Sequence, residues 1–122
     1  MRILYVEDNP ELRETIGMLM EREGQTVTAC ATAEEALELD ARQSFDVLVS
    51  DVSLPGLSGT DLARRVLAQD PDRWVVLCSG YELGKYPDAW GPNVRTLLKP
   101  FEVDELETLL GNIRHAVHTT GA

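Results

Sequence analysis

The chain has 122 residues, 43% of them hydrophobic, and its 21 acidic and 11 basic side chains give a formal net charge of −10. This length allows one compact core and is too short for two ordinary domains. The negative charge argues against a broad surface for nucleic acid or an anionic membrane, and it favours cations and basic partners. The sequence shows neither a membrane-spanning apolar run nor a signal-peptide pattern after Met1, so we expect one cytosolic domain. Cys30 and Cys78, without a CxxC or histidine neighbour, are interpreted as small buried hydrophobes.

Short apolar runs alternate with amphipathic stretches along the whole chain. In chain order, the runs predict strands at Arg2–Val6, Thr26–Cys30, Asp46–Ser50, Trp74–Cys78 and Val94–Leu98. The first helix has the clearest signals, with Asn9 as its N-cap, Pro10 at its first position and Gly24 just past its end. Its apolar inward face is predicted to consist of Leu12, Ile16, Leu19 and Met20. Helical spacing predicts three more helices at Ala33–Arg42, Thr60–Gln69 and Val103–His118.

The segment Gly80–Asn93, between the fourth and fifth predicted strands, has a weaker helical pattern. Its two prolines and three glycines disfavour a regular helix. We therefore expect an irregular or shortened fourth helix there, in the least stable part of the domain.

Strict alternation of strands and helices predicts an α/β fold with a single five-stranded parallel sheet covered on both faces. In such sheets ligands bind beyond the carboxyl ends of the strands. Polar residues follow four of the five predicted strands at these ends. They are Glu7 and Asp8 after the first, Asp51 after the third, Ser79 after the fourth and Lys99 after the fifth.

These motifs together resemble the receiver domain of two-component response regulators. The resemblance lies in the carboxylate pair, the stretch "DVSLPGLSG", the hydroxyl after the fourth strand and the Lys-Pro-Phe after the fifth. It covers residues 1–118 as one receiver domain and leaves 119–122 as a C-terminal tail. The resemblance implies a doubly wound, flavodoxin-like (βα)5 fold with strand order 2-1-3-4-5, an order that the spacing alone does not give.

The resemblance also assigns roles at the strand ends. Asp51 would be the phosphoacceptor, taking a phosphoryl group from the phosphohistidine of a sensor histidine kinase or a phosphotransfer domain. Mg²⁺ would be bound by Asp8, Asp51 and the backbone carbonyl of Ser53, with Glu7 acting mainly through water. A hard divalent cation suits this place, because three carboxylates that converge there repel one another.

The remaining assignments concern charge neutralisation and switching. Lys99 would neutralise phosphoryl charge, Ser79 would donate a hydrogen bond to a phosphoryl oxygen, and Lys99–Pro100 would be a candidate cis peptide bond. Thr96 replaces an aromatic residue that usually moves with the hydroxyl at position 79. Tyr81, together with Ser53, occupies a position that tunes hydrolysis of the acyl phosphate. Such a protein catalyses only its own phosphorylation and dephosphorylation and passes the signal to a downstream protein or effector domain.

Several alternatives remain at this level. Taken singly, the Glu7-Asp8 pair has an ordinary explanation as negative charge at a helix N-terminus, and Lys99 has one as a solvated loop residue. A haloacid dehalogenase-type phosphatase needs a second aspartate where Ser53 stands, and an FMN module needs a phosphate-binding loop in place of "EDNPE". The nearer alternative is a pseudo-receiver, a scaffold that is never phosphorylated, which the residue Thr96 favours.

Overall fold

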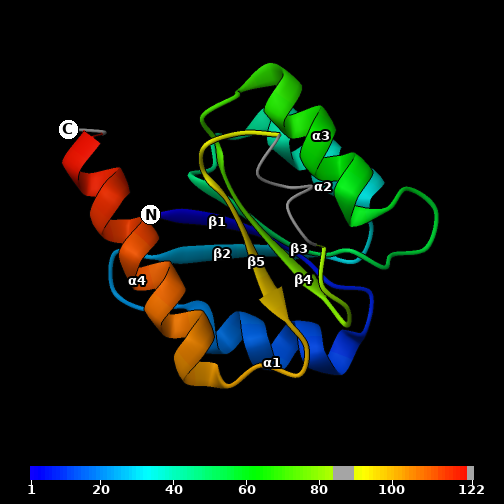
Figure 1. Ribbon diagram of the computed structural model, residues 1–122, viewed down its shortest axis with the longest axis horizontal. Coiled ribbons are helices and arrows are strands. Elements are labelled where there is room, and N and C mark those ends of the chain that lie inside the picture. Colours follow the sequence, from blue (N-terminus) through cyan, green and yellow to red (C-terminus); the bar gives the residue numbers. More distant parts are fainter. Residues whose placement is uncertain (84–89, 121–122) are drawn as a thin grey trace.

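The residues that the structure describes form a parallel sheet of five strands with two helices on each face (Figure 1). It is a computed structural model, and it describes residues 1–83 and 90–120. The strands are β1 (Arg2–Val6), β2 (Thr26–Cys30), β3 (Val47–Asp51), β4 (Trp74–Ser79) and β5 (Val94–Leu98). The helices are α1 (Pro10–Met20), α2 (Ala33–Arg42), α3 (Gly59–Gln69) and α4 (Val103–Thr120). None of the helices in these described ranges combines the length and hydropathy needed to cross a membrane.

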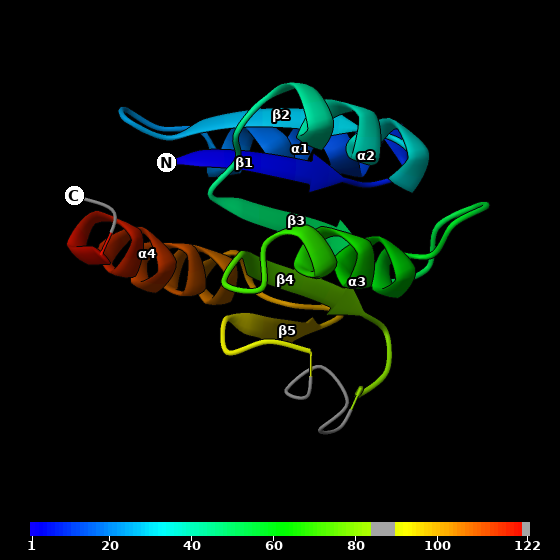
Figure 2. The same ribbon diagram turned by 90° about the horizontal axis from the view of Figure 1, so that it is seen from above.

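The strand order is β2-β1-β3-β4-β5, with every neighbouring pair parallel, so the predicted fold class and order are confirmed. The strand arrows in Figure 2 point the same way, which brings their carboxyl ends to one edge of the sheet. Since β1 pairs with β3, with Val6 beside Ser50, the loop after β1 lies next to Asp51 at the end of β3. This is the point where the winding direction of the sheet reverses.

Each of the first three helices begins at a side chain that caps its free backbone N–H groups. Asn9, just before α1, accepts hydrogen bonds from the N–H groups of Glu11 and Leu12 in the first turn of the helix. Thr32 and Ser58 each accept one N–H bond, three residues on, at the starts of α2 and α3. These caps fix where each helix leaves the loops at the carboxyl edge of the sheet.

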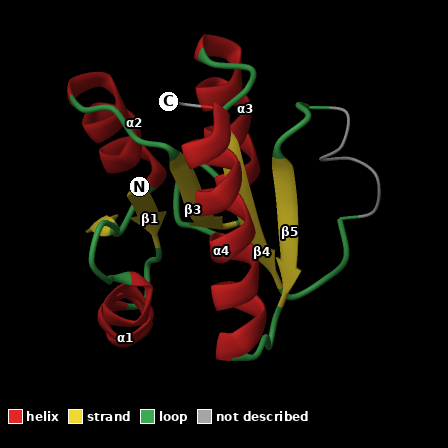
Figure 3. Ribbon diagram, turned by 90° about the vertical axis from the view of Figure 1, so that its left-hand side faces the viewer, coloured by secondary structure: helices red, strands yellow, loops and turns green. Residues whose placement is uncertain are grey.

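The two faces of the sheet form separate apolar layers. On one face α2 and α3 pack on the strands through Ala33, Ala36, Leu62, Ala63, Val66 and Leu67. On the other face α1 and α4 contribute Met20, Leu106, Leu110 and Ile113. In Figure 3, α1 is seen end-on while α4 stands upright, so these two helices cross instead of packing side by side.

A buried amide connects the distant parts of this second layer. The Gln25 side chain donates to the carbonyl of Met20 at the end of α1, and its oxygen accepts from Arg114 of α4 at 2.9 Å. Gln25 is almost completely buried. Because a buried amide without partners would be costly, this pair of bonds fixes α4 against the turn that follows α1.

Some element boundaries differ from the sequence-based expectations. Strand β3 extends to Asp51 and β4 to Ser79, since Asp51 still pairs with Cys78 and Ser79 with Leu98. Helix α4 continues past the predicted His118 to Thr120. The cysteines are free and buried, as predicted.

Two further expectations have a different outcome. Residues 84–89 of the predicted irregular fourth helix lie outside the described residues, and residues 80–83 and 90–93 contain no helix. The predicted inward face of α1 is only partly covered, because Leu12 is 44% exposed and Leu19 is also exposed.

Gly59 should be intolerant of any side chain. A Cβ atom at this first residue of α3 would lie 1.8 Å from the backbone carbonyl oxygen of Asp51, whereas one at Gly17 in α1 would meet no atom within 4 Å. We expect Gly59→Ala to destabilise the fold by about 3 kcal/mol. The matched Gly17→Ala should be neutral or stabilising by up to about 1 kcal/mol. Urea unfolding of both variants measures this, and equal stabilities would contradict the close approach of α3 to β3.

Candidate functional site

Three carboxylates converge at the carboxyl edge of the sheet. One oxygen each of Glu7, Asp8 and Asp51 lies within 4.8 Å of the others. Glu7 is 4% exposed and Asp51 9% exposed, while Asp8 is open to solvent. The adjacency of β1 and β3 therefore produces the cluster that the sequence predicted.

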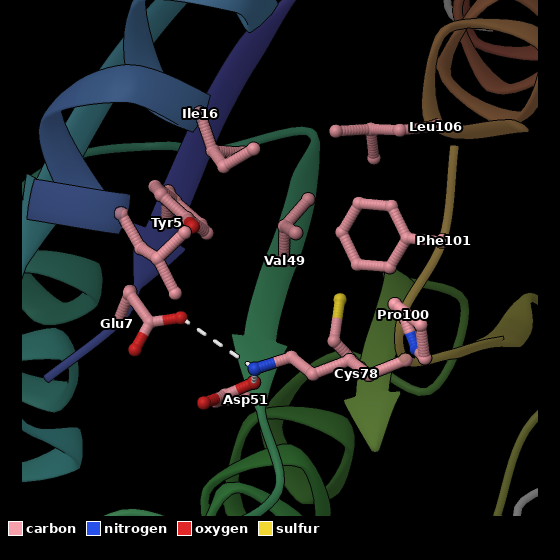
Figure 4. Close-up of a pocket in the computed structure, with 11 residues that line it drawn as sticks. Tyr5, Glu7, Ile16, Val49, Asp51, Cys78, Pro100, Phe101 and Leu106 are labelled. Atoms are coloured by element: carbon pink, nitrogen blue, oxygen red, sulfur yellow. Dashed lines mark ion pairs between the residues drawn. The ribbon is translucent and has the colours of Figure 1, made fainter. Parts of the chain in front are cut away.

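Lys99, from the loop after β5, supplies the positive charge of the site. Its Nζ forms a short ion pair with Asp51 and lies 3.7 Å from Oε1 of Glu7, the contact that is visible as a dashed line in Figure 4. Its backbone N–H donates to the carbonyl of Ser79 at 2.7 Å. The Lys99–Pro100 bond is cis, as expected.

The charges in this cluster shift one another's protonation. Burial and the neighbouring charge of Asp51 raise the pKa of Glu7, although the N–H of Asn9 and the charge of Lys99 act in the opposite direction. Burial by itself would lower the pKa of Lys99, but its hydrogen bond to Asp51 and the charges of Asp51 and Glu7 raise it overall. Lys99 thus stays a cation. Glu7 is the carboxylate whose ionised form the crowded negative charge disfavours.

The first loop is held by bonds that the sequence did not indicate. The N–H of Asn9 donates to Oε2 of Glu7 at 3.1 Å, and Arg13 of α1 donates to the backbone carbonyl of Glu7 at 2.9 Å. These bonds fix Glu7 from both its side chain and its backbone. The sequence does not predict this role of Arg13, because helical spacing does not show which arginine side chain bends back toward the preceding loop.

The loop after β3 is held from another helix. Glu34 of α2 accepts the N–H of Leu57 at 3.3 Å, beside Gly56, whose φ of 74° is in the left-handed region. This loop also contains Ser53, which is exposed. The sequence does not predict this contact of Glu34 either, because Leu57 is 23 residues away and only the tertiary fold brings the two together.

The donor set suits a hard divalent cation. All the side-chain ligands in the cluster are carboxylate oxygens, the type that Mg²⁺ prefers. A cation at Asp51 would compete with the ammonium of Lys99 for the same carboxylate. The carbonyl of Ser53, two residues beyond Asp51, is a further backbone candidate for the set.

A family model for the response regulator receiver domain matches residues 3–111 of the chain. The chain belongs to this family.

Curated relatives of this receiver differ greatly in length. The response regulator receiver protein CpdR of Brucella abortus is 31% identical over 115 residues, covering 89% of this chain and 96% of CpdR. The C4-dicarboxylate transport transcriptional regulatory protein DctD of Pseudomonas aeruginosa is 34% identical, covering 95% of this chain and 25% of DctD. The transcriptional regulatory protein YkoG of Bacillus subtilis is 32% identical, covering 98% of this chain and 52% of YkoG. The chain therefore spans nearly all of CpdR but only a quarter to about half of the longer relatives.

Solved structures agree with this assignment. The response regulator TrrA of Thermotoga maritima, in complex with Mg²⁺-BeF, superposes with a TM-score of 0.79 at 26% identity, covering 92% of this chain and 97% of TrrA. The receiver domain of the hybrid histidine kinase CckA superposes with a TM-score of 0.76 at 30% identity, covering 93% and 98%.

Ser79, the remaining predicted residue of the receiver site, is engaged elsewhere. Its hydroxyl donates to the carbonyl of Tyr81 at 2.7 Å and accepts the N–H of Tyr81 at 3.1 Å. With Thr96 and Tyr81 it lines a hollow of about 220 Å³ on the β5 side. The structure thus brings Glu7, Asp8, Asp51 and Lys99 together and leaves Ser79 turned away from them.

Neutralising Glu7 should stabilise the metal-free receiver at neutral pH. Because the pKa of Glu7 is raised in the fold, its ionised form opposes folding, and this cost is present at neutral pH and disappears as the pH falls toward the ordinary value of 4.5. Glu7→Gln keeps an oxygen for the N–H of Asn9 and should raise the melting temperature by a few degrees in EDTA at pH 7. The difference in melting temperature between Glu7→Gln and the unmodified protein should disappear near pH 4.5.

Thermal unfolding across this pH range, followed by circular dichroism, tests the expectation. Glu14→Gln, at an exposed position of the adjacent helix α1, is the matched control and should leave the melting temperature unchanged. A lower melting temperature for Glu7→Gln at pH 7 would show that the ionised carboxylate supports the fold.

Proposed function

We propose that this receiver accepts a phosphoryl group on Asp51 from the phosphohistidine of a sensor kinase or a phosphotransfer domain, in the cytosol and with bound Mg²⁺. An oxygen of Asp51 would attack phosphorus, and the P–N bond would break with its electron pair returning to the imidazole. The observation that carries the proposal is the position of Asp51, between two other carboxylates and the ammonium of Lys99. Beyond its own phosphorylation and dephosphorylation, the domain would turn over no substrate.

Each residue of the cluster would contribute position or charge, which is most of what phosphoryl transfer requires. Asp8, Asp51 and the carbonyl of Ser53 would hold the metal, and Glu7 would bind mainly through its water ligands. Bound Mg²⁺ would supply positive charge to the phosphoryl oxygens. Lys99 would move from the Asp51 carboxylate to a phosphoryl oxygen, so the ion pair already present marks where that charge is needed.

Signal output would begin at Ser79. To donate to a phosphoryl oxygen, its hydroxyl must leave the carbonyl of Tyr81, and this exchange would disturb the segment after β4. We propose that this disturbance changes a surface that a downstream protein or effector domain reads. Tyr81 and Ser53 would tune the lifetime of the acyl phosphate. Part of that segment, residues 84–89, lies outside the described residues.

A pseudo-receiver that acts as a scaffold is the second candidate. It is favoured by Thr96, which offers no aromatic ring to follow Ser79, and by the engagement of Ser79 with Tyr81. The two candidates differ in whether Asp51 is ever phosphorylated.

Acetyl phosphate with Mg²⁺ should add one phosphoryl group per chain, because the metal and Lys99 together offset the charge of the incoming group. Intact-mass analysis measures the addition. It should be absent in EDTA and in Asp51→Asn, while Asp61→Asn, at an exposed position of α3, should react like the unmodified protein. Modification that persists in Asp51→Asn would refute the assignment. No modification of the unmodified protein, even by phosphoramidate, would favour the scaffold.

Mg²⁺ should raise the melting temperature, since the converged carboxylates bind it in the folded chain and are separated in the unfolded one. At a concentration about 100 times the dissociation constant, the stabilisation should be about 2.7 kcal/mol. Asp8→Asn should remove most of this effect, and the exposed control Asp61→Asn should keep it. Differential scanning fluorimetry with increasing Mg²⁺ provides the measurement, and an unchanged response in Asp8→Asn would exclude this residue as a ligand.

A further inference from the structure

A cavity of about 440 Å³ lies between α1 and α4, on the sheet face that these helices cover. The volume falls within the range of small-molecule sites, about 300–1,000 Å³. Figure 4 shows Ile16, Val49, Phe101 and Leu106 around this space, above the acidic cluster. The two helices that border the cavity cross each other over this face of the sheet (Figure 3).

Most of the wall is apolar. Leu12 and Ile16 come from α1, Val49 from β3, and Phe101 and Leu106 from the start of α4 and the loop before it. The buried thiol of Cys78 also lines the cavity. Charged side chains are confined to the end of the cavity where Lys99 is paired with the carboxylates of the site.

One polar group on the wall has no protein partner among the described residues. Tyr5 is 5% exposed and lines the cavity, yet its hydroxyl has no hydrogen-bond partner among the described residues. No fully buried polar side-chain atom in the described ranges lacks a partner, so this oxygen keeps some accessible surface. A tyrosine phenol is neutral at pH 7 and can donate a hydrogen bond.

The chemistry of the wall selects the kind of ligand. An anion would be repelled by Glu7 and Asp51 at the charged end. An organic cation would lose its hydration against the apolar walls, and an ammonium group has no lone pair to accept the Tyr5 hydroxyl. An uncharged molecule avoids both penalties and buries apolar surface against the walls.

We propose that this cavity binds an uncharged, mainly apolar small molecule of one or two rings that accepts a hydrogen bond from Tyr5. The proposal does not rest on phosphoryl transfer, although the charged end of the cavity shares Glu7, Asp51 and Lys99 with that site.

Acetophenone and ethylbenzene test this with one matched pair of probes, since they have similar shapes and only acetophenone has an acceptor. Both are titrated at equal concentrations into the metal-free, unphosphorylated chain and followed by ¹H–¹⁵N correlation spectra. Acetophenone should give saturable shifts at residues around the cavity, such as Ile16 and Val49, and bind more tightly than ethylbenzene. Tyr5→Phe should weaken acetophenone binding about fivefold, the effect of one hydrogen bond, and leave ethylbenzene unchanged.

A second variant tests the location. Leu12, 44% exposed, stands at the border of the cavity, and Leu12→Trp should obstruct it and reduce the affinity for both probes at least tenfold. Leu98→Trp, at a leucine 48% exposed on β5 and away from this cavity, is the matched control and should bind both normally. Absence of saturable shifts, unaltered acetophenone affinity in Tyr5→Phe, or shifts unaffected by Leu12→Trp would each overturn the proposal. Since no phosphorylation is measured, these outcomes are separate from the fate of Asp51.

Discussion

The pairing of two buried carboxylates with one lysine is the interaction on which this site depends. Glu7 and Asp51 lie at the ends of adjacent central strands, where the sheet buries them and water cannot screen their charges. Lys99 comes from the far edge strand and contacts both. The ion pairs therefore join the first, third and fifth strands across the carboxyl edge. Any cation or phosphoryl group that enters the site would have to displace Lys99 from one of these carboxylates.

This arrangement follows from parallel pairing. A parallel sheet requires each strand to begin at the same edge, so all the loops that follow strands gather at the other edge. The chain places its short polar segments in those loops and caps the following helices with Asn9, Thr32 and Ser58. Gly59 then lets α3 start against the backbone of Asp51. Local signals and global topology agree, which is the condition for a unique fold.

The same agreement explains what could be predicted from the sequence. Apolar runs and helical spacing predicted the strands and helices, and the charged residues at the strand ends predicted the acidic cluster with Lys99. Both are local sequence patterns, and each is typical of a single kind of structure. The strand order needed the family resemblance. Arg13 and Glu34 were not foreseen, since each acts on a loop far from its own helical context. The partial exposure of Leu12 escaped prediction too, because spacing shows which side of a helix is apolar but not how closely a second helix covers it.

Gln25 has a mechanical consequence for helix α4. Its amide fastens the helix at Arg114, while the other end of the helix borders the cavity through Leu106. The loop that carries Lys99 leads directly into the start of this helix. The placement of α4 on the sheet therefore sets two things together, the position of one wall of the cavity and the point from which Lys99 reaches the carboxylates.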